Sequence, residues 1–245
     1  MQFFQLCARS IDYCPPIDIT FGDFLRAIIT VSRDLDPADD DCVRDALMEA
    51  FRLRGIYSES ASFYSEDALS WPPDVDLPAI DDLVFGSPNG LTSKEKDHNG
   101  DLLRSWANKN RAALGLDPDI PISVPSFHPV FRTSENGRLR MEMVVEIIQS
   151  RQAQFSDAFP QAGTFPFRAG VTLIVEAPEL KHTRGQTVEE PPKVRFVIGR
   201  AMTGPDAKQR EEKQCNFAMA QGLAAGDTQD PTHFQANFCI LHQEY

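Results

Sequence analysis

The feature that most constrains this chain is a change in the period of its apolar residues near residue 120. From Arg138 to Gln149 apolar and polar residues alternate, directly after the turn sequence Ser134–Gly137. A period of two is typical of a β-strand with one buried face, and Asn-Gly favours a tight hairpin. The alternation recurs at residues 171–175 and 194–198. Together with residues 130–133, these segments predict a four-stranded antiparallel sheet arranged as a meander.

Before residue 120 the apolar residues recur every three or four positions, which indicates helices. The clearest helix is predicted to follow Asp36 as its N-cap, with Pro37 in the first turn and Gly55 as the left-handed residue after its end. Thr20 and Asp23 have the spacing of a capping pair at the start of another helix. The remaining predicted helices cover residues 1–9, which read as the end of a helix, then 20–33, 65–71, 101–114 and 205–220.

Proline- and glycine-rich stretches predict where one structured segment of the chain ends and the next begins. Pro72-Pro73 opens a stretch rich in Pro, Asp and Gly, which predicts an irregular connection over residues 72–100. We therefore expect a helical segment at 1–71, a helix plus antiparallel-sheet domain at 101–221, and a tail at 222–245. Residues 178–192 are predicted to be a polar loop. The expected fold class is α+β, an N-terminal helical segment followed by a four-stranded antiparallel sheet with packing helices.

The charge of the chain is unevenly distributed. The net charge is −12, and residues 1–120 contribute −11 of it, with 22 acidic against 11 basic residues. This disfavours a sequence-independent nucleic-acid binder and a protein that docks on anionic lipid, since both need Lys and Arg. The apolar runs are shorter than the ~18 residues of a spanning helix, and the first residues do not resemble a signal peptide. We therefore predict a cytoplasmic protein with a protein partner or self-association, and neither a nucleic-acid nor a membrane partner.

The cysteines and histidines form no recognisable catalytic or metal motif. The cysteines are odd in number and never spaced as Cys-x-x-Cys, so we expect reduced, small apolar residues. No two histidines stand in the His-Glu-x-x-His arrangement of zinc peptidases. A nucleophilic pair such as Cys215 with His233 stays open. The residues considered are Cys7, Cys14, Cys42, Cys215 and Cys239, and His98, His128, His182, His233 and His242.

Two further patterns are similar to known functional motifs, one for binding calcium and one for carrying a nucleophile. Both fit a structural role better. The acidic run Asp34–Asp41 has Ala38 at position 5, Asp39 in place of the glycine at position 6 and Asp45 at position 12 of a calcium loop, so helix capping explains it better. Gly86–Gly90 has proline where a nucleophile elbow has serine, and it is expected to be a surface turn. The sequence therefore predicts no catalytic, cofactor-binding or metal-binding residue, and no cofactor.

One part of the chain nevertheless resembles a known family. The segments Asp12–Ala27, Glu49–Tyr57 and Ser65–Trp71 resemble a region of large bacterial metallopeptidases of the gluzincin type. Phe167–Val175 and Val194–Ile198 are more weakly similar to a small strand-rich domain of the same proteins. In that family the first region lies downstream of the His-Glu-x-x-His helix. This sequence has no such helix, so no catalytic residue of the family can be assigned to any of its positions.

The resemblance implies a non-catalytic accessory or interaction module related to the C-terminal region of those metallopeptidases. Such a module is expected to carry an exposed apolar surface where the peptidase domain would sit. Two alternatives remain open. The first is an unrecognised hydrolase whose site is assembled only in three dimensions, and the second is a structural or interaction protein unrelated to peptidases.

Overall fold

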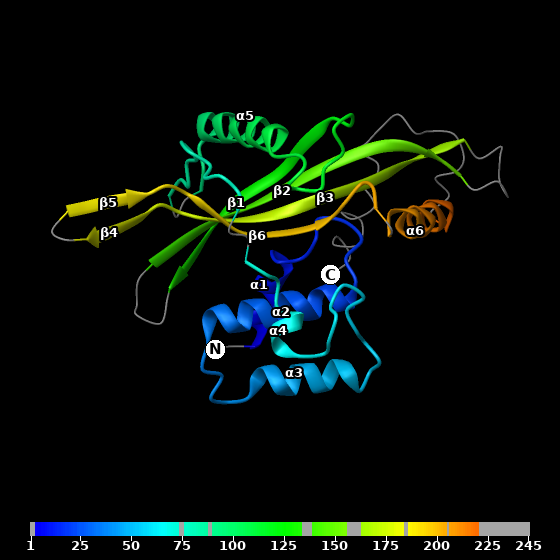
Figure 1. Cartoon of the computed structure of the whole chain (residues 1–245), viewed down its shortest axis with the longest axis horizontal. Coiled ribbons are helices and arrows are strands. Elements are labelled where there is room, and N and C mark those ends of the chain that lie inside the picture. The colour runs from blue at the N-terminus through cyan, green and yellow to red at the C-terminus, as the bar shows by residue number, and fades with distance from the viewer. Residues whose placement is uncertain are drawn as a thin grey trace, which may run out of the picture. The chain divides into compact units, whose positions relative to one another are not determined.

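The fold is known from a computed structural model that describes residues 3–73, 76–87, 90–133, 139–155, 163–183, 186–204 and 206–220. The helices are α1 (Phe3–Ile11), α2 (Phe21–Leu35), α3 (Val43–Arg52), α4 (Glu66–Leu69), α5 (Ser93–Lys109) and α6 (Ala207–Ala220). The strands are β1 (Ile122–Thr133), β2 (Leu139–Gln154), β3 (Thr164–Glu176), β4 (Glu179–Thr183), β5 (Gln186–Glu190) and β6 (Lys193–Arg200). The α+β class is confirmed (Figure 1).

The chain divides into two compact units, which are described separately. Unit 1 comprises Met1–Gln149 and Ala169–Met202, and unit 2 comprises Ser150–Arg168 and Thr203–Tyr245. The long strands β2 and β3 contribute residues to both. No helix in the described part of the chain combines the length and the apolar character needed to cross a membrane.

The predicted meander is confirmed, because the sheet has the strand order β1-β2-β3-β6. Residues 178–192, predicted to be a loop, instead contain the two-stranded hairpin β4–β5. The expected turn at Ser134–Gly137 lies outside the described residues. The hairpin β4–β5 was predicted as a loop because its residues are mostly polar. They lack the apolar alternation by which strands are recognised in a sequence.

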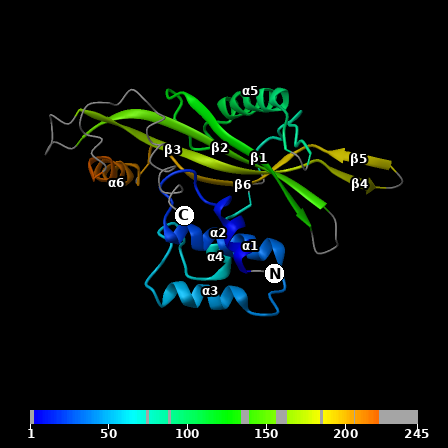
Figure 2. The same cartoon turned by 180° about the vertical axis from the view of Figure 1, so that it is seen from behind.

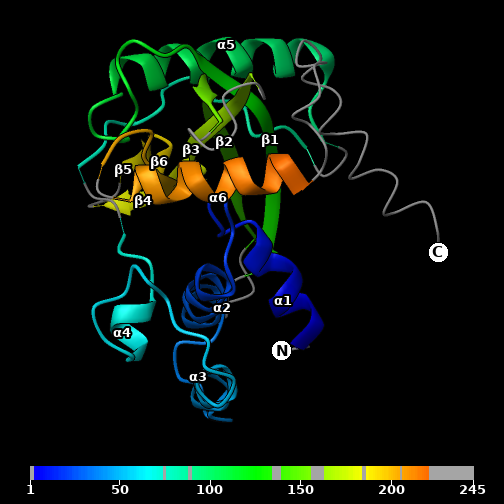
Figure 3. The same ribbon diagram turned by 90° about the vertical axis from the view of Figure 1, so that its right-hand side faces the viewer.

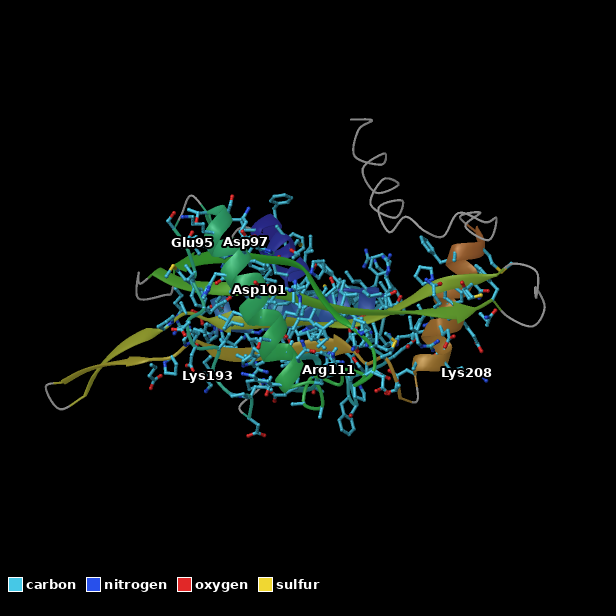
Figure 4. The ribbon with its side chains drawn as sticks, turned by 90° about the horizontal axis from the view of Figure 1, so that it is seen from above. Glu95, Asp97, Asp101, Arg111, Lys193 and Lys208 are labelled. Carbon is cyan, nitrogen blue, oxygen red and sulfur yellow. The ribbon has the colours of Figure 1, made fainter. Side chains whose placement is uncertain are left out.

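Both faces of the sheet in unit 1 are covered by helices. One face packs against α5, which crosses the strands with the exposed residues Asp97 and Asp101 on its outer side (Figure 4). The other face packs against the layer α1–α4, here called the helical layer (Figures 2 and 3). The centre of β2 is consequently buried on both sides, with Val144 at 3% and Val145 at 0% exposure. The prediction of a half-buried strand is wrong for this reason.

The two faces have separate apolar cores. The α5 core contains Leu103 and Trp106 of α5 with Met143, Val145 and Ile147 of β2. The core of the helical layer joins Leu25, Ile28 and Ile29 of α2 to strand residues of the opposite face, including Val144, Ile174, Phe196 and Ile198. Adjacent residues along each strand therefore serve different cores, as the pleat of a strand requires.

The helix caps were predicted with mixed success. The Thr20 hydroxyl and the Asp23 carboxylate form a reciprocal capping box on α2, as expected. The assignment of Asp36 as N-cap of α3 is wrong, because Asp36 still closes α2 through its amide N–H to the carbonyl of Ser32. The carboxylate of Asp39 instead accepts the amides at the start of α3, which begins at Val43. Gly55 does adopt the expected left-handed conformation after α3.

The helix predicted at 101–114 begins earlier and ends earlier. Thr92 and Glu95 form a capping box, and α5 runs from Ser93 to Lys109. The predicted connection at 72–100 therefore includes the first turns of α5. The predicted domain limits at residues 71, 100 and 221 stay predictions.

Unit 2 contains the ends of β2 and β3 and the helix α6. The side-chain amide of Gln214 donates to the carbonyl of Arg168 and accepts the amide N–H of Arg168, each at 2.9 Å. Arg151 forms an ion pair with Glu211 at 2.8 Å. The helix expected at 205–220 is thus present, and it is bonded to the strand ends of its own unit.

Candidate functional site

Two largely buried ion pairs join α2 of unit 1 to the edge strand β6. Asp23 pairs with Arg200 and Asp34 pairs with Arg195. The two acids are eleven residues apart on a helix, about 16 Å at its rise per residue. The two arginines are five residues apart on a strand, also about 16 Å. The matched spacing fixes α2 antiparallel to β6, with one ion pair near each end.

A third acid completes the pair at Arg195. The Arg195 guanidinium also donates to Glu142 at 2.9 Å, and the Tyr13 hydroxyl donates to the same carboxylate at 3.2 Å. Burial alone would lower the pKa of Arg195, but the hydrogen bond and charge of Asp34, with Tyr13 and Glu142, raise it. The arginine therefore stays charged and has no proton to exchange. This cluster is suited to holding the layers together rather than to acid–base chemistry.

A second cluster, formed by Asp12, His128 and Glu146, is able to exchange protons. The Nε2 atom of His128 on β1 lies 3.5 Å from a carboxylate oxygen of Asp12, which follows α1. The hydrogen bond to Asp12 raises the pKa of the imidazole, although burial opposes it, and the charges of Asp12 and Glu146 add to the rise. Burial also raises the pKa of Glu146 on β2. The cluster therefore holds a proton more tightly than free His and Glu side chains do.

The other cysteine and histidine candidates are placed as follows. The Cys14 thiol is buried and donates to the carbonyl of Ser10, and burial, with Asp23 and Asp12, raises its pKa to about 12. Such a thiol is a poor nucleophile. The His98 ring lies 3.1 Å from the carbonyl of Asp82 at the surface. Cys7, Cys42 and Cys215 are free thiols. The residues that cannot be located, because they or their side chains lie outside the description, are His182, His233, Cys239 and His242.

The acidic run Asp34–Asp41 and the turn at Gly86–Gly90 form ion pairs and hydrogen bonds within the fold. Asp34 binds Arg195, whereas Asp36 and Asp39 accept backbone amides, so these carboxylates do not converge. Among the described residues no group of three or more His, Cys, Asp or Glu side chains is arranged to hold a metal. Ser87 and Gly90 bridge each other across a turn, in agreement with the expected surface turn.

Unit 2 contains a cavity of about 600 Å³ between α6 and the strand ends. Its lining includes the rings of Phe155 and Phe165, which are tilted against each other at 45°, and the buried residue Cys215. Gln154, Lys208, Glu211, Glu212 and Asn216 complete the lining. None of these lining residues is a histidine, and His233, the partner considered for Cys215, lies outside the description. The cavity and the proton-binding cluster of unit 1 thus have no residue in common.

Large apolar side chains are exposed mainly in the helical layer. Of the nine such side chains in the described part of the chain, eight lie at or before residue 63. Five of them gather where α2 begins and α3 ends, two points that lie at the same end of the helical layer (Figure 1). We call this surface the apolar end. Its members are Ile19, Phe21, Leu53, Tyr57 and Phe63, each 55–75% exposed.

Close packing of the backbone brings the parts of the apolar end together. A Cβ atom added to Gly22 would lie 2.4 Å from the carbonyl oxygen of Tyr57, so only glycine allows this approach. The Tyr57 ring packs edge-on against Tyr64, the neighbour of Phe63, with centroids 5.4 Å apart. The segments that carry Phe21, Tyr57 and Phe63 therefore meet at one junction. Scattered exposed apolar residues need no explanation, but a group of aromatic residues is typical of a binding surface.

Comparisons with known protein families, with curated proteins and with solved structures find no match to this chain.

Proposed function

We propose that the chain is a non-catalytic interaction module, related to the C-terminal region of gluzincin-type metallopeptidases, which acts in the bacterial cytoplasm. The observation that carries the proposal is the apolar end. It lies within residues 11–71, the part of the sequence with the more specific resemblance to those peptidases. The resemblance implies an exposed apolar surface where a peptidase domain would sit, and the apolar end is a surface of that kind.

The composition of the apolar end suits a protein partner. Aromatic residues are enriched at the centres of protein interfaces, and full burial of one Phe contributes about 1.5–3 kcal/mol. Residues 36–67 around it contain nine acidic and three basic residues, a net charge of −6. The partner is therefore a separate protein with an apolar, basic surface, and the resemblance points to one that carries a peptidase domain.

The proposal is tested by cross-linking mass spectrometry in the source cells with the double variant Phe21→Ser/Phe63→Ser. Both side chains are mostly in solvent, so the fold should be retained while partner cross-links are lost. Phe217→Ser, which removes an exposed aromatic residue of unit 2, is the matched control and should keep them. Unchanged cross-links in the double variant would refute the proposal, as would stoichiometric zinc together with peptide cleavage by the purified protein.

A hydrolase is the second candidate, and the cavity of unit 2 with Cys215 favours it. A thiol enzyme needs a base to activate the nucleophile, and the described lining offers carboxylates but no imidazole. Ester and peptide hydrolysis by the wild type and by Cys215→Ala separates the candidates. Turnover that disappears in Cys215→Ala would favour the hydrolase, whereas the interaction module should show no turnover.

A further inference from the structure

The helix α1 exposes apolar residues along the side that faces solvent. Leu6 and Ser10, one turn apart, are buried in the fold. Phe4, Ala8 and Ile11 recur at spacings of four and three residues and are all exposed, Phe4 at 81% and Ile11 at 62%. Residues three or four apart lie on one face of a helix, so these three side chains form one outward row. We call this row the α1 stripe.

The α1 stripe lies at the flank of the helical layer. Figure 3 shows α1 next to α2, on the opposite side of that helix from α4. A surface helix normally presents polar residues to water, and an apolar outer side is typical of a helix that packs against another element. The α1 stripe is therefore a candidate contact surface. It shares no residue with the apolar end.

The helix α1 is free of acidic residues, although it belongs to the half of the chain that carries most of the negative charge. No Asp or Glu occurs before Asp12. The one charged side chain of α1 is Arg9, whose guanidinium donates to the carbonyl of Phe131 in the same chain at 3.2 Å. Asp12, which follows the helix, lies 3.5 Å from His128. The α1 stripe itself carries no charge, so an equally uncharged, apolar partner surface fits it best.

The order of residues makes the α1 stripe complementary to itself. Phe4 and Ile11 lie at its two ends, about 10.5 Å apart along the helix, and Ala8 lies near its middle. In an antiparallel pair of α1 helices, a two-fold axis between residues 7 and 8 places Phe4 of each copy opposite Ile11 of the other. The same axis places Ala8 opposite Cys7, and these small side chains allow the helix axes to approach closely.

Size and net charge limit the strength of such a contact. A stable interface has about 20–30 residues on each side, far more than the α1 stripe provides. Each copy also carries a net charge of −12, which opposes association. Two copies can therefore approach with least repulsion through a surface without acids, and α1 is such a surface.

We propose that the chain forms a weak, reversible dimer in which the α1 stripes of two copies pack antiparallel about a two-fold axis. The occupant of the stripe is thus a second copy of this chain, because the stripe is uncharged and its two ends complement each other. The contact does not use the apolar end, so the proposal goes beyond the proposed function and can succeed or fail without it.

The test measures self-association of the full chain by sedimentation equilibrium over a series of concentrations. The key variant is Phe4→Ser, which should retain the fold because its side chain is mostly in solvent. Phe217→Ser, which removes an exposed Phe from unit 2, is the matched control. The dimer should be weakened about tenfold or more by Phe4→Ser and less than about threefold by Phe217→Ser.

A charge exchange at Ala8 identifies the occupant. In the proposed dimer the two Ala8 residues lie close to each other beside the axis, so Ala8→Glu alone or Ala8→Lys alone brings like charges together. Each variant alone should dimerise about tenfold or more weakly than the wild type. An equimolar mixture of the two should form mixed dimers within about threefold of the wild-type affinity. A contact with a different apolar surface would give no such rescue.

Salt gives a readout that needs no variant. Raising NaCl from about 0.05 to 0.5 M should strengthen the dimer, because screening weakens the repulsion between two acidic copies. A dimer weakened by salt would contradict the proposal, since it would be held by ion pairs that the α1 stripe does not offer.

Three further results would overturn the proposal. The first is a wild type that stays monomeric up to about 1 mM, the weak end of specific association. The second is a dimer that is lost in Phe21→Ser/Phe63→Ser and kept in Phe4→Ser, which would assign the contact to the apolar end. The third is a mixture of the two Ala8 variants that associates no better than either variant alone.

Discussion

The helices on the two faces of the sheet in unit 1 are held in place by different kinds of interaction. The α5 face is an apolar core in which Leu103 and Trp106 fill space against β2 and β3. The helical layer adds buried charges to its apolar core, and these join α2 to β6 at both ends of the helix. Apolar burial is non-directional, whereas an ion pair has a defined partner and geometry. The helix α5 therefore needs only to cover its face, whereas α2 is fixed in direction and register.

The largest effect is expected from Arg195→Met, which breaks this arrangement on the helical side. Glu142 and Asp34 would lose the cation between them, and Glu142 is only 1% exposed. Removal of one partner from a buried ion pair typically costs about 3–5 kcal/mol. Urea denaturation should report this loss. Arg104→Met, which breaks an exposed pair with Asp101 on α5, should cost less than about 1 kcal/mol. Similar losses in both variants would contradict the comparison.

A somewhat smaller effect is expected from Leu103→Ala on the α5 face. Leu103 is fully buried, so truncation leaves a cavity and should cost about 2–4 kcal/mol. No charge is involved, and the loss should therefore stay the same between 0.05 and 1 M NaCl, roughly the range over which screening changes most. A loss that varied strongly with salt would show that charges also act on this face.

The smallest effect concerns the pH dependence of the helical side. The pKa of His128 is raised above its ordinary value of 6.5, so its contribution to stability is complete below that pH and is lost as the pH rises through the folded pKa. The raised pKa of Glu146 acts in the same direction from 4.5 upwards. His128→Gln should therefore destabilise at pH 5.5, by less than about 1 kcal/mol because the ring is half exposed, and be nearly neutral at pH 8.5.

Urea midpoints at these two pH values measure the His128 effect. Leu103→Ala serves as the control, since its loss should not change in the same direction with pH. A His128→Gln loss that grew towards pH 8.5 would contradict the assigned sign.

The parts of the fold that sequence reasoning found are those with local signals. The Thr20 hydroxyl caps the helix that follows it, as its spacing from Asp23 indicates. The start of α5 was missed because residues 93–101 are entirely polar and lack apolar periodicity. The capping box at Thr92 and Glu95 was the signal that could have located it. Asp36 was wrongly predicted as the N-cap of α3 because an Asp-Pro pair fits the start of a helix as well as the end of one, where Asp36 lies.

The candidate sites were less predictable, since their residues meet only through tertiary structure. His128 was considered only as a surface or core imidazole, and no local pattern links it to Asp12 or Glu146. The ion pairs between α2 and β6 join residues 161 and 177 positions apart, which no window of sequence contains. An exposed apolar surface was expected from the resemblance, but its residues could not be named in advance.

The ion pairs between α2 and β6 also have a consequence for biosynthesis. Asp23 and Arg200 are 177 residues apart in the chain, and Asp34 and Arg195 are 161 residues apart. At about 5–20 residues per second, a ribosome needs on the order of ten to thirty seconds to cover that interval. The first helices therefore emerge long before the strand that neutralises them, and their carboxylates must stay hydrated meanwhile. Folding of this layer can be completed only late in translation, once β6 has left the exit tunnel.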